Sequence, residues 1–216
     1  MNRFLFPIVV LSLLLASCDR SVQKSYWENG RLKSELRYQD GQLDGECSWY
    51  HPNGRIWRRL SYREDSKEGH SLRWHENGQL AEEAWYKNDQ YDSVRLLYSE
   101  KGALVAEEHY VDGKLDGAFR KWYDNGQVFQ DGQYAEGMMD GDWYIFYPDG
   151  SLASLAHYEK GRGKQTGYDE TGCKIMEATY LDNKKHGKEI RYATNGTVLQ
   201  EIEYEYGNAV SGLSPE

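Results

Sequence analysis

A tandem repeat of about 24 residues constrains the fold of this chain more than any other feature. A turn-like pair ending in glycine recurs at Asn29-Gly30, Asn53-Gly54, Asn77-Gly78, Lys101-Gly102, Asn125-Gly126, Asp149-Gly150, Thr171-Gly172 and Asn195-Gly196. Successive glycines are 24 residues apart, except that 22 residues separate Gly150 from Gly172. A fixed period of this length indicates one supersecondary unit stacked many times.

Two aromatic positions keep the same phase. Four residues before each glycine stands Tyr26, Tyr50, Trp74, Tyr98, Trp122, Phe146, Tyr168 or Tyr192. Eight residues after each glycine stands Tyr38, Tyr62, Tyr86, Tyr110, Tyr134, Tyr158, Tyr180 or Tyr204. We therefore assign the eight glycines and the eight following tyrosines as the structural positions of the repeat.

Each unit has the alternation of a β-strand. After Gly30, Leu32 and Leu36 share one parity with Tyr38, while charged residues take the other. Period-two alternation is typical of a half-buried strand. The preceding Asn-Gly pair is a strong hairpin signal, because both residues can take positive φ. We expect two short strands per unit, and no window has a sustained helical period.

A second glycine set follows each tyrosine and is expected to reverse the chain into the next unit. It reads Gly41 and Gly45, Gly113 and Gly117, and Gly137 and Gly141. The sixth unit compresses it to Gly161-Arg162-Gly163, which accounts for the two missing residues. Other units keep the set in part, with Ser93 where Gly69 and Gly187 stand elsewhere.

The unit [Tyr/Trp]-x-x-Asn-Gly-x-Leu-x-x-x-x-x-Tyr-x-x-Gly-x-x-x-Gly resembles the MORN variant repeat of bacterial proteins that are often labelled YwqK-type antitoxins. The resemblance covers about residues 26 to 212. It implies an all-β fold, an elongated single-layer antiparallel meander of about eight tandem β-hairpins. Sixteen strands at about 4.8 Å each would give a sheet about 75 Å long.

The N-terminus has the features of an export signal. Arg3 precedes an uncharged, mostly apolar run from Phe4 to Ala16. This run is too short to span a bilayer but has the length of a signal-peptide core. It ends in Leu15-Ala16-Ser17-Cys18, which resembles the lipobox of bacterial lipoproteins. The resemblance implies cleavage before Cys18 and acylation of that cysteine; the alternative is an ordinary secretory signal with a chance cysteine.

We expect four segments along the chain. They are a signal peptide over 1–17, expected to be a cleaved helix, a lipidated tether over 18–25, the repeats over 26–212 and a tail over 213–216. Acyl chains contribute about 0.8 kcal/mol of membrane binding per buried CH₂, so Cys18 would anchor the protein stably. The expected location is the bacterial cell envelope. Asp19 resembles an inner-membrane retention signal of enteric bacteria, and we leave both membranes open.

The charge balance limits the class of partner. The chain has a formal net charge of -9, and loss of Arg3 with the signal would make it -10. An acidic surface is repelled by nucleic acid and by anionic headgroups. We therefore expect no nucleic-acid partner, and membrane contact through the lipid anchor alone.

The repeat predicts aromatic ladders on one face of the sheet. The eight tyrosines share a parity with Leu32, Ile56, Leu80, Leu104, Val128 and Leu152. One interpretation is a purely structural core. The other is that part of the ladder lines an exposed aromatic groove, since tyrosine suits recognition surfaces.

Some residues depart from the repeat and are more specific to this chain. The position five residues before each repeat glycine, which we call the variable slot, differs between units. It holds Trp49, Arg73, Leu97, Lys121, Ile145 and Arg191. Additional aromatic residues stand outside the two ladders. The candidate binding surface comprises Trp49, Trp57, Trp85, Phe129 and Trp143. The alternative is drift at tolerant surface positions.

The sequence offers no pattern of a catalytic or metal site. His70 and His75 have an odd spacing that places them on opposite faces of a strand, which disfavours a shared metal. The adjacent carboxylates Glu82 and Glu83 likewise point apart, which is unsuited to acid/base pairing. Nucleophile-elbow, zincin and phosphate-loop motifs do not occur. We expect no enzyme, no metal and no cofactor, and we expect the remaining cysteines to be free thiols or one of them to be buried in a strand.

Three functions compete. The preferred one is a lipid-anchored scaffold of the cell envelope that binds a protein or a glycan along the sheet without catalysis. The family label implies an antitoxin or immunity protein that neutralises a partner toxin. An enzyme acting on envelope polysaccharide is the third and is disfavoured, because no pair of carboxylates converges.

Overall fold

The computed structural model describes residues 19–213 as one antiparallel sheet of eighteen strands. Their bounds are β1 Arg20–Tyr26, β2 Leu32–Gln39, β3 Gln42–Leu43, β4 Gly45–Tyr50, β5 Ile56–Arg63, β6 Ser66–Trp74, β7 Leu80–Lys87, β8 Gln90–Tyr98, β9 Leu104–Val111, β10 Lys114–Trp122, β11 Val128–Ala135, β12 Met138–Phe146, β13 Leu152–Glu159, β14 Arg162–Tyr168, β15 Lys174–Leu181, β16 Lys184–Tyr192, β17 Val198–Glu205 and β18 Asn208–Leu213. Over 19–213 no helix is present, and so none that could cross a membrane. The expected signal helix and Cys18 lie outside the described residues.

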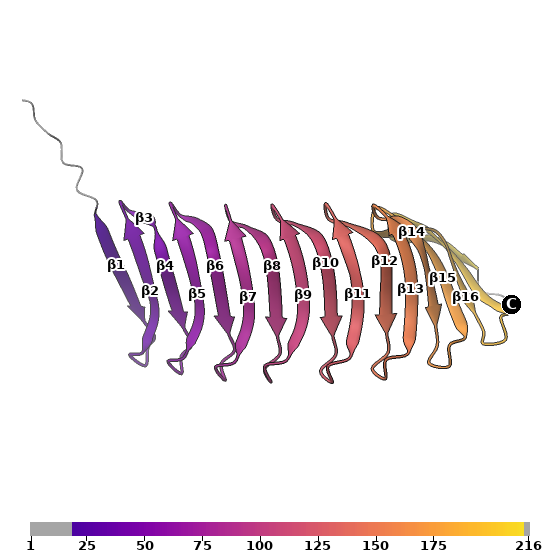
Figure 1. Cartoon of the computed structure of the whole chain (residues 1–216), viewed down its shortest axis with the longest axis horizontal. Helices are drawn as coiled ribbons and strands as arrows, with labels where there is room; N and C mark the ends of the chain where they lie inside the picture. The colour runs from indigo at the N-terminus through magenta and orange to yellow at the C-terminus, as the bar shows by residue number, and fades with distance from the viewer. Residues whose placement is uncertain (1–18, 214–216) are drawn as a thin grey trace, which may run out of the picture.

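Strand pairing follows the order of the chain, so the sheet is a hairpin meander. Each strand pairs with its sequence neighbours, and β2 pairs with both β3 and β4, which form one strand interrupted at Asp44. Figure 1 shows a single layer that runs from β1 at one end of the molecule towards the later strands at the other. The predicted all-β antiparallel meander is confirmed.

The array begins earlier than the sequence indicated. Residues 20–25, expected to belong to the tether, form most of β1, and β1 pairs with β2 from Arg20 to Tyr26. Every residue of β1 is exposed. Apart from Val22 and Tyr26 this edge strand is polar and carries no hydrophobic alternation, which is why the pattern did not reveal it. Eighteen strands replace the expected sixteen, because β1 is added and one expected strand is divided into β3 and β4.

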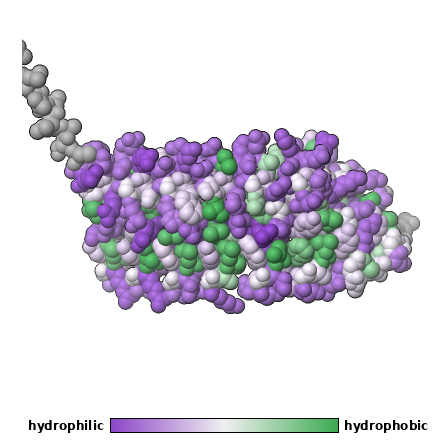
Figure 2. Space-filling model, viewed as in Figure 1, coloured by the Kyte–Doolittle hydropathy of each residue, from purple (hydrophilic) through white to green (hydrophobic). Residues whose placement is uncertain are grey.

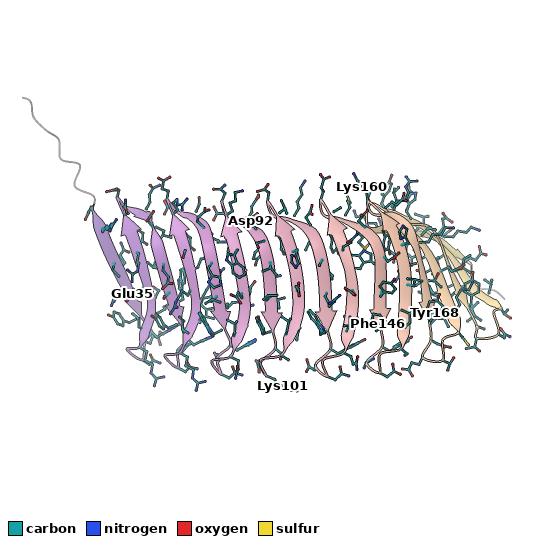
Figure 3. All side chains as sticks on the ribbon, viewed as in Figure 1. Glu35, Asp92, Lys101, Phe146, Lys160 and Tyr168 are labelled. Carbon is teal, nitrogen blue, oxygen red and sulfur yellow. The ribbon has the colours of Figure 1, made fainter. Side chains whose placement is uncertain are left out.

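One long edge of the sheet consists of two-residue turns. In each turn both central residues have positive φ, the signature of the type I′ hairpin turn that matches strand twist. The turns are Asp40-Gly41, Glu64-Asp65, Asn88-Asp89, Asp112-Gly113, Glu136-Gly137, Lys160-Gly161, Asp182-Asn183 and Tyr206-Gly207. Lys160 marks this edge in Figure 3, whereas Lys101 marks the opposite edge.

The Asn-Gly turns of the opposite edge differ from the expected geometry. Gly30 has a φ of 78°, but Asn29 is not among the residues with positive φ. The Gly30 N–H donates to the Trp27 carbonyl (2.9 Å), and the Trp27 N–H donates to the Arg31 carbonyl (2.8 Å). This is a longer loop in which glycine alone takes the left-handed bulge position. The expectation of positive φ at both residues was wrong because the loop holds more than two residues.

The asparagine of this loop instead ties neighbouring turns together. Asn29 accepts from the Arg31 N–H through Oδ1 (3.1 Å) and donates through Nδ2 to the Pro52 carbonyl of the next turn (2.9 Å). The same bridge recurs at Asn53, Asn77 and Asn125. These amides therefore act as an edge ladder that runs perpendicular to the strands.

A bulge in the strand that follows most of the type I′ turns sets the length of the repeat. Residues with positive φ occur inside these strands at Gly45, Gly69, Ser93, Gly117, Gly141 and Gly187. The β13–β14 pairing shows no register shift, and Gly163 does not have a positive φ. The two residues missing from the sixth unit are thus the missing bulge.

The unit without a bulge is where the sheet changes direction. Figure 1 shows the strands after β14 swinging behind those before it. Across this corner Asn183 donates to the Gly137 carbonyl (2.9 Å) and accepts from the Met139 N–H (2.8 Å). A Cβ on Gly161 would lie 2.8 Å from the Asn183 Oδ1 atom, so three successive turns converge there.

The core lies almost entirely on one face, which we call the tyrosine face because it carries the eight tyrosines of the repeat. Leu60, Ala84 and Tyr86 form one cluster in the first half of the array. Phe119, Trp143, Ala156 and Tyr158 form a second cluster next to the corner. In Figure 2 the apolar residues of the viewed side gather along its middle, with hydrophilic residues along both long edges.

The two cysteines of the described chain are free thiols, as expected. Cys47 is fully buried in β4, where its Sγ atom accepts from the Arg37 N–H (3.3 Å). The buried thiol therefore fills the place where β3 and β4 are interrupted.

Ser93 should be a strained position whose replacement stabilises the fold. Its φ of 77° lies where the other bulges have glycine, and a left-handed non-glycine residue costs of order 1–3 kcal/mol. Glycine offsets part of this gain, because its backbone loses more freedom on folding, at a cost of about 0.5–1 kcal/mol. Ser93→Gly should therefore raise the free energy of unfolding by about 0.5–1 kcal/mol, measured by urea denaturation. Ser48→Gly, in an ordinary strand conformation, should lower it; a loss of stability in both variants would refute strain at Ser93.

Candidate binding face

The variable slot of the repeat forms one continuous row on the tyrosine face. Cross-strand pairing links Ser34, Trp49, Arg58, Arg73, Glu82, Leu97, Ala106, Lys121, Gln130, Ile145 and Ser154 in this order. We call these residues the variable row. Its even-strand members are the slot that the sequence singled out, and side chains opposite one another on a sheet face interact directly. The row therefore places side chains that differ between units on a backbone that is the same in every unit.

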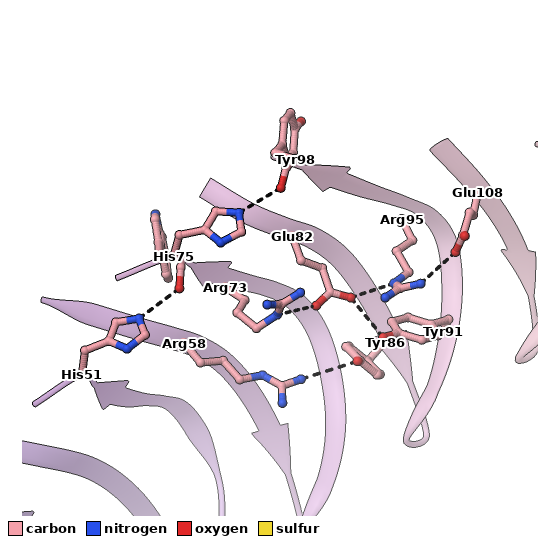
Figure 4. A network of polar contacts seen from close by, with 11 residues as sticks. His51, Arg58, Arg73, His75, Glu82, Tyr86, Tyr91, Arg95, Tyr98 and Glu108 are labelled. Carbon is pink, nitrogen blue, oxygen red and sulfur yellow. Dashed lines mark hydrogen bonds and ion pairs between the residues drawn. The ribbon is translucent and has the colours of Figure 1, made fainter. Parts of the chain in front are cut away.

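A charged network occupies the centre of the row, as Figure 4 shows. Glu82 is 8% exposed and accepts from Arg73 Nε (2.9 Å) and Arg95 Nε (2.7 Å). The Tyr91 hydroxyl donates to the same carboxylate (3.1 Å). Arg95 also donates to Glu108 (2.8 Å). Two acidic side chains thus share one guanidinium.

The network fixes the protonation states of its members. Burial favours the neutral acid, but hydrogen bonds from Arg95 and Arg73 outweigh it and lower the pKa of Glu82. Burial, with a hydrogen bond to Glu108, raises the pKa of Tyr110 to about 12. At neutral pH the centre of the row therefore holds fixed charges of both signs next to neutral phenols.

Arg58 leaves part of its hydrogen-bonding capacity unused. Its Nη2 atom lies 3.5 Å from the Tyr86 hydroxyl. Its Nε atom is the one fully buried side-chain nitrogen or oxygen without a partner among the described residues. Buried donors are normally paired. Arg58 is consequently the row member most in need of an acceptor.

The aromatic residues expected to form one surface divide between the two faces. Trp49 lies on the tyrosine face, packed against the Leu60 cluster. Trp57 lies on the opposite face with 41% of its surface exposed. Trp85 and Phe129 share that opposite face, where Trp85 stacks on His70 with 4.7 Å between ring centroids. The structure therefore does not gather these side chains into a single patch.

Trp143 belongs to the core and not to a binding surface. It is only 4% exposed, and its indole N–H donates to the Gln133 carbonyl (3.1 Å). Gly132 makes the space, because a Cβ there would lie 2.3 Å from the Trp143 ring. Glycine inside a strand often marks such a close approach. The assignment of Trp143 to the surface was wrong, since the vacant side of Gly132 receives its ring.

Several histidines have structural partners. His51 and His75 place Nε2 near the Trp74 and Tyr98 carbonyls of the following units, at 3.1 and 2.9 Å (Figure 4). On the opposite face, His70 pairs with Glu83 (2.8 Å). Within residues 19–213, no three His, Cys, Asp or Glu side chains cluster as metal ligands. These roles were missed by sequence reasoning, although Trp27, His51 and His75 occupy the same repeat position.

A cleft of about 250 Å³ opens on the tyrosine face at the corner. Gln130, Met139, Trp143, Ile145, Ser154, Ala156, Tyr158, Gln165, Tyr180 and Asn183 line it. It spans β11 to β15 because the sheet turns there. We refer to it as the corner cleft. No sequence signal revealed it beyond the two-residue deletion in the sixth unit.

Comparison with known families identifies the repeat. The family profile described as MORN repeat variant matches residues 22–40, 43–64, 67–88, 115–136, 139–160 and 185–206. No curated protein matches the chain.

Two solved structures match this chain over most of its length. One is a crystal structure of TcdB2-TccC3-Cdc42, and the other is the Photorhabdus luminescens Tc holotoxin pore. Each is 12% identical to this chain with a TM-score of 0.22, and each match covers 91% of this chain. The chain spans 15% of the length of those chains.

The Glu82 network should make stability depend on pH. Because the folded-state pKa of Glu82 is lowered, its stabilisation is present above its unfolded pKa of about 4.3 and is lost as pH falls through the folded value. Glu82→Gln should cost about 1.5–3 kcal/mol at pH 7 and progressively less below pH about 4. Urea denaturation across this range measures the difference.

Glu83→Gln is the matched control on the opposite face. That carboxylate pairs with a half-exposed His70, so its replacement should cost less than about 1 kcal/mol. An equal loss for both variants at pH 7, or a loss for Glu82→Gln that does not shrink in acid, would contradict the role of the network.

Proposed function

Since this chain belongs to the MORN repeat variant family, we propose that it is a non-catalytic interaction scaffold, tethered to the bacterial cell envelope by lipid on Cys18. The repeat units fill residues 20–213, so the scaffold is the dominant feature of the chain. In repeat proteins each unit contacts mainly its neighbours, which produces an extended surface suited to elongated partners. The partner would be a protein or a glycan of the envelope.

The observation that carries the proposal is the variable row. Positions that keep the fold, the turn glycines and the ladder tyrosines, repeat along the whole array. Positions that differ from unit to unit align across the strands from Trp49 to Ile145 on one face. This arrangement suits a specific binding surface, because the side chains of the row differ between units while the backbone that carries them stays constant.

The chemistry of the row suits recognition better than catalysis. Trp49, Leu97 and Ile145 offer half-buried apolar surface, and Lys121 offers a positive charge above the Phe119 ring at 5.0 Å. Apolar contacts with interspersed charges are typical of protein interfaces. The one carboxylate of the row, Glu82, is paired with Arg73 and Arg95. A group held ionised by two cations is a poor general base.

The proposed anchor fits the start of the array. The first strand begins at Arg20, two residues after Cys18. So short a connection would hold β1 close to the membrane surface, with the rest of the array extending from it. The acidic chain would be repelled by anionic headgroups and would therefore depend on the lipid for attachment.

Replacement of Cys18 should release the protein from the membrane. Cys18→Ser should abolish incorporation of a radiolabelled fatty acid and move the protein from the detergent phase to the aqueous phase of a Triton X-114 partition, because the acyl chains supply the binding energy. Cys173→Ser should leave both readouts unchanged. Absence of label from the unaltered protein would disprove the anchor.

Removal of the row side chains should remove the partner. A variant with Trp49→Ala, Leu97→Ala and Lys121→Ala should lose most of the species captured by crosslinking and mass spectrometry on the native membrane fraction. The matched control carries Trp57→Ala, Trp85→Ala and Phe129→Ala on the opposite face and should keep them. Urea denaturation verifies that both variants fold. Identical capture by both would argue against a recognition row, and loss only in the control would place binding on the other face.

A further inference from the structure

We propose that the corner cleft binds a neutral sugar ring, as one residue of a larger glycan. The inference rests on the proposed scaffold function and names the chemistry of one part of its surface. Three properties of the cleft carry it: its size, its lack of charge and its unpaired hydroxyl and amide groups.

The size of the cleft fits one ring. Its volume of about 250 Å³ falls below the range of about 300–1,000 Å³ typical of sites for drug-sized ligands. The corner produces it, because β14 lacks the bulge and the tyrosine face folds inward between β11 and β15. Asn183 holds the rim by bridging the Gly137 carbonyl and the Met139 N–H. The course of the backbone and the Asn183 hydrogen bonds therefore determine the shape of the cleft.

Its lining contains no charged side chain. This is unlike the centre of the variable row, where Arg58, Arg73 and Glu82 lie side by side. An ionised ligand in the corner cleft would lose hydration without gaining an opposite charge, which is strongly unfavourable. The cleft therefore selects a neutral ligand.

Two polar groups in the lining have no protein partner. The Tyr158 side chain is 4% exposed, and its hydroxyl makes no hydrogen bond with any residue in 19–213. Among the same residues, Arg58 Nε is the one fully buried side-chain nitrogen or oxygen that lacks a partner. The unpaired Tyr158 hydroxyl is therefore not fully buried and can be reached from the cleft. The Gln130 amide, a member of the variable row, likewise makes no hydrogen bond within the described chain. Both groups can donate and accept, as sugar hydroxyls do.

The remaining polar groups are held in place. Gln165 accepts from the Tyr180 hydroxyl (2.7 Å) and donates to Ser154 Oγ (2.8 Å). Ser154 in turn donates to the Thr166 carbonyl (3.0 Å). One amide proton of Gln165 and one lone pair of its oxygen stay free. A fixed amide next to a free hydroxyl is a preorganised arrangement that costs little entropy on binding.

The apolar part of the cleft completes the fit. Ile145, Met139 and the Tyr180 ring are half-buried and give a surface for the C–H groups of a sugar. A wholly apolar ligand would cover Tyr158 and Gln130 without pairing them, which costs about 1–3 kcal/mol for each unsatisfied group. A ring with apolar C–H groups and hydroxyls satisfies both kinds of surface.

Isothermal titration calorimetry on the full array tests the inference. The probes are neutral oligosaccharides of glucose, mannose, galactose and N-acetylglucosamine, with oligogalacturonate as the anionic comparison. At least one neutral probe should bind, and oligogalacturonate should not. Tyr158→Phe removes only the hydroxyl and should weaken binding about three- to tenfold. Gln130→Met, of similar size, should weaken it by a similar factor. Tyr62→Phe, at the same repeat position outside the cleft, should change nothing.

Three results would overturn the inference: no heat with any neutral probe at millimolar concentration, tighter binding of oligogalacturonate, or affinities unchanged in both Tyr158→Phe and Gln130→Met. The scaffold proposal fails separately. Its triple variant alters Trp49, Leu97 and Lys121, none of which lines the cleft. Loss of captured partners in that variant without any sugar binding would leave the scaffold standing and remove the sugar site. If sugar binding depends on Tyr158 but capture is unchanged in the triple variant, the sugar site stands and the variable row is refuted as the recognition surface of the scaffold.

Discussion

Hydrogen bonding between neighbouring strands is the interaction on which the rest of this protein depends. The sheet has one layer, so no second layer packs over it and its backbone pairing must be continuous from β1 to β18. Stability then arises as a sum of contacts between adjacent units. Side-chain ladders reinforce the same direction. Asparagine amides join the turns of one edge, and type I′ turns stack along the other, as where the Gly137 N–H donates to the Leu115 carbonyl.

A single layer also determines what the core can be. Without a covering layer, one face has to bury its side chains against one another, and polar residues become part of that core. Glu82 and Glu189 are both buried on the tyrosine face, each paired with two cations. A buried carboxylate without such partners would be severely destabilising. At Glu82 the paired charges therefore support the fold and also give the variable row its chemical character.

Departures from the repeat concentrate the features that distinguish this protein. The missing bulge in β14 turns the sheet and creates the corner cleft, while Gly132 admits the Trp143 ring to the core beside it. The variable row passes from the charged centre into this uncharged cleft through Lys121, Gln130 and Ile145. One continuous surface thus joins a charged and a neutral region, which suits the elongated partner that we propose.

The sequence by itself determined the local features: the 24-residue period, the strand alternation, the positions of the turns and the all-β meander. Local hydrogen bonding and side-chain alternation dictate these, so they can be read from residues close together in the chain. Only the tertiary structure decided the rest. Trp49 lies on the tyrosine face because it pairs with Ser34 of β2 and with Arg58 of β5, and the register of these pairings is set between strands and not within one. The burial of Trp143 depends on a gap at Gly132 in a neighbouring strand, and the corner depends on Asn183 contacts that span 44 and 46 residues. Such distant contacts leave no periodic trace in the sequence.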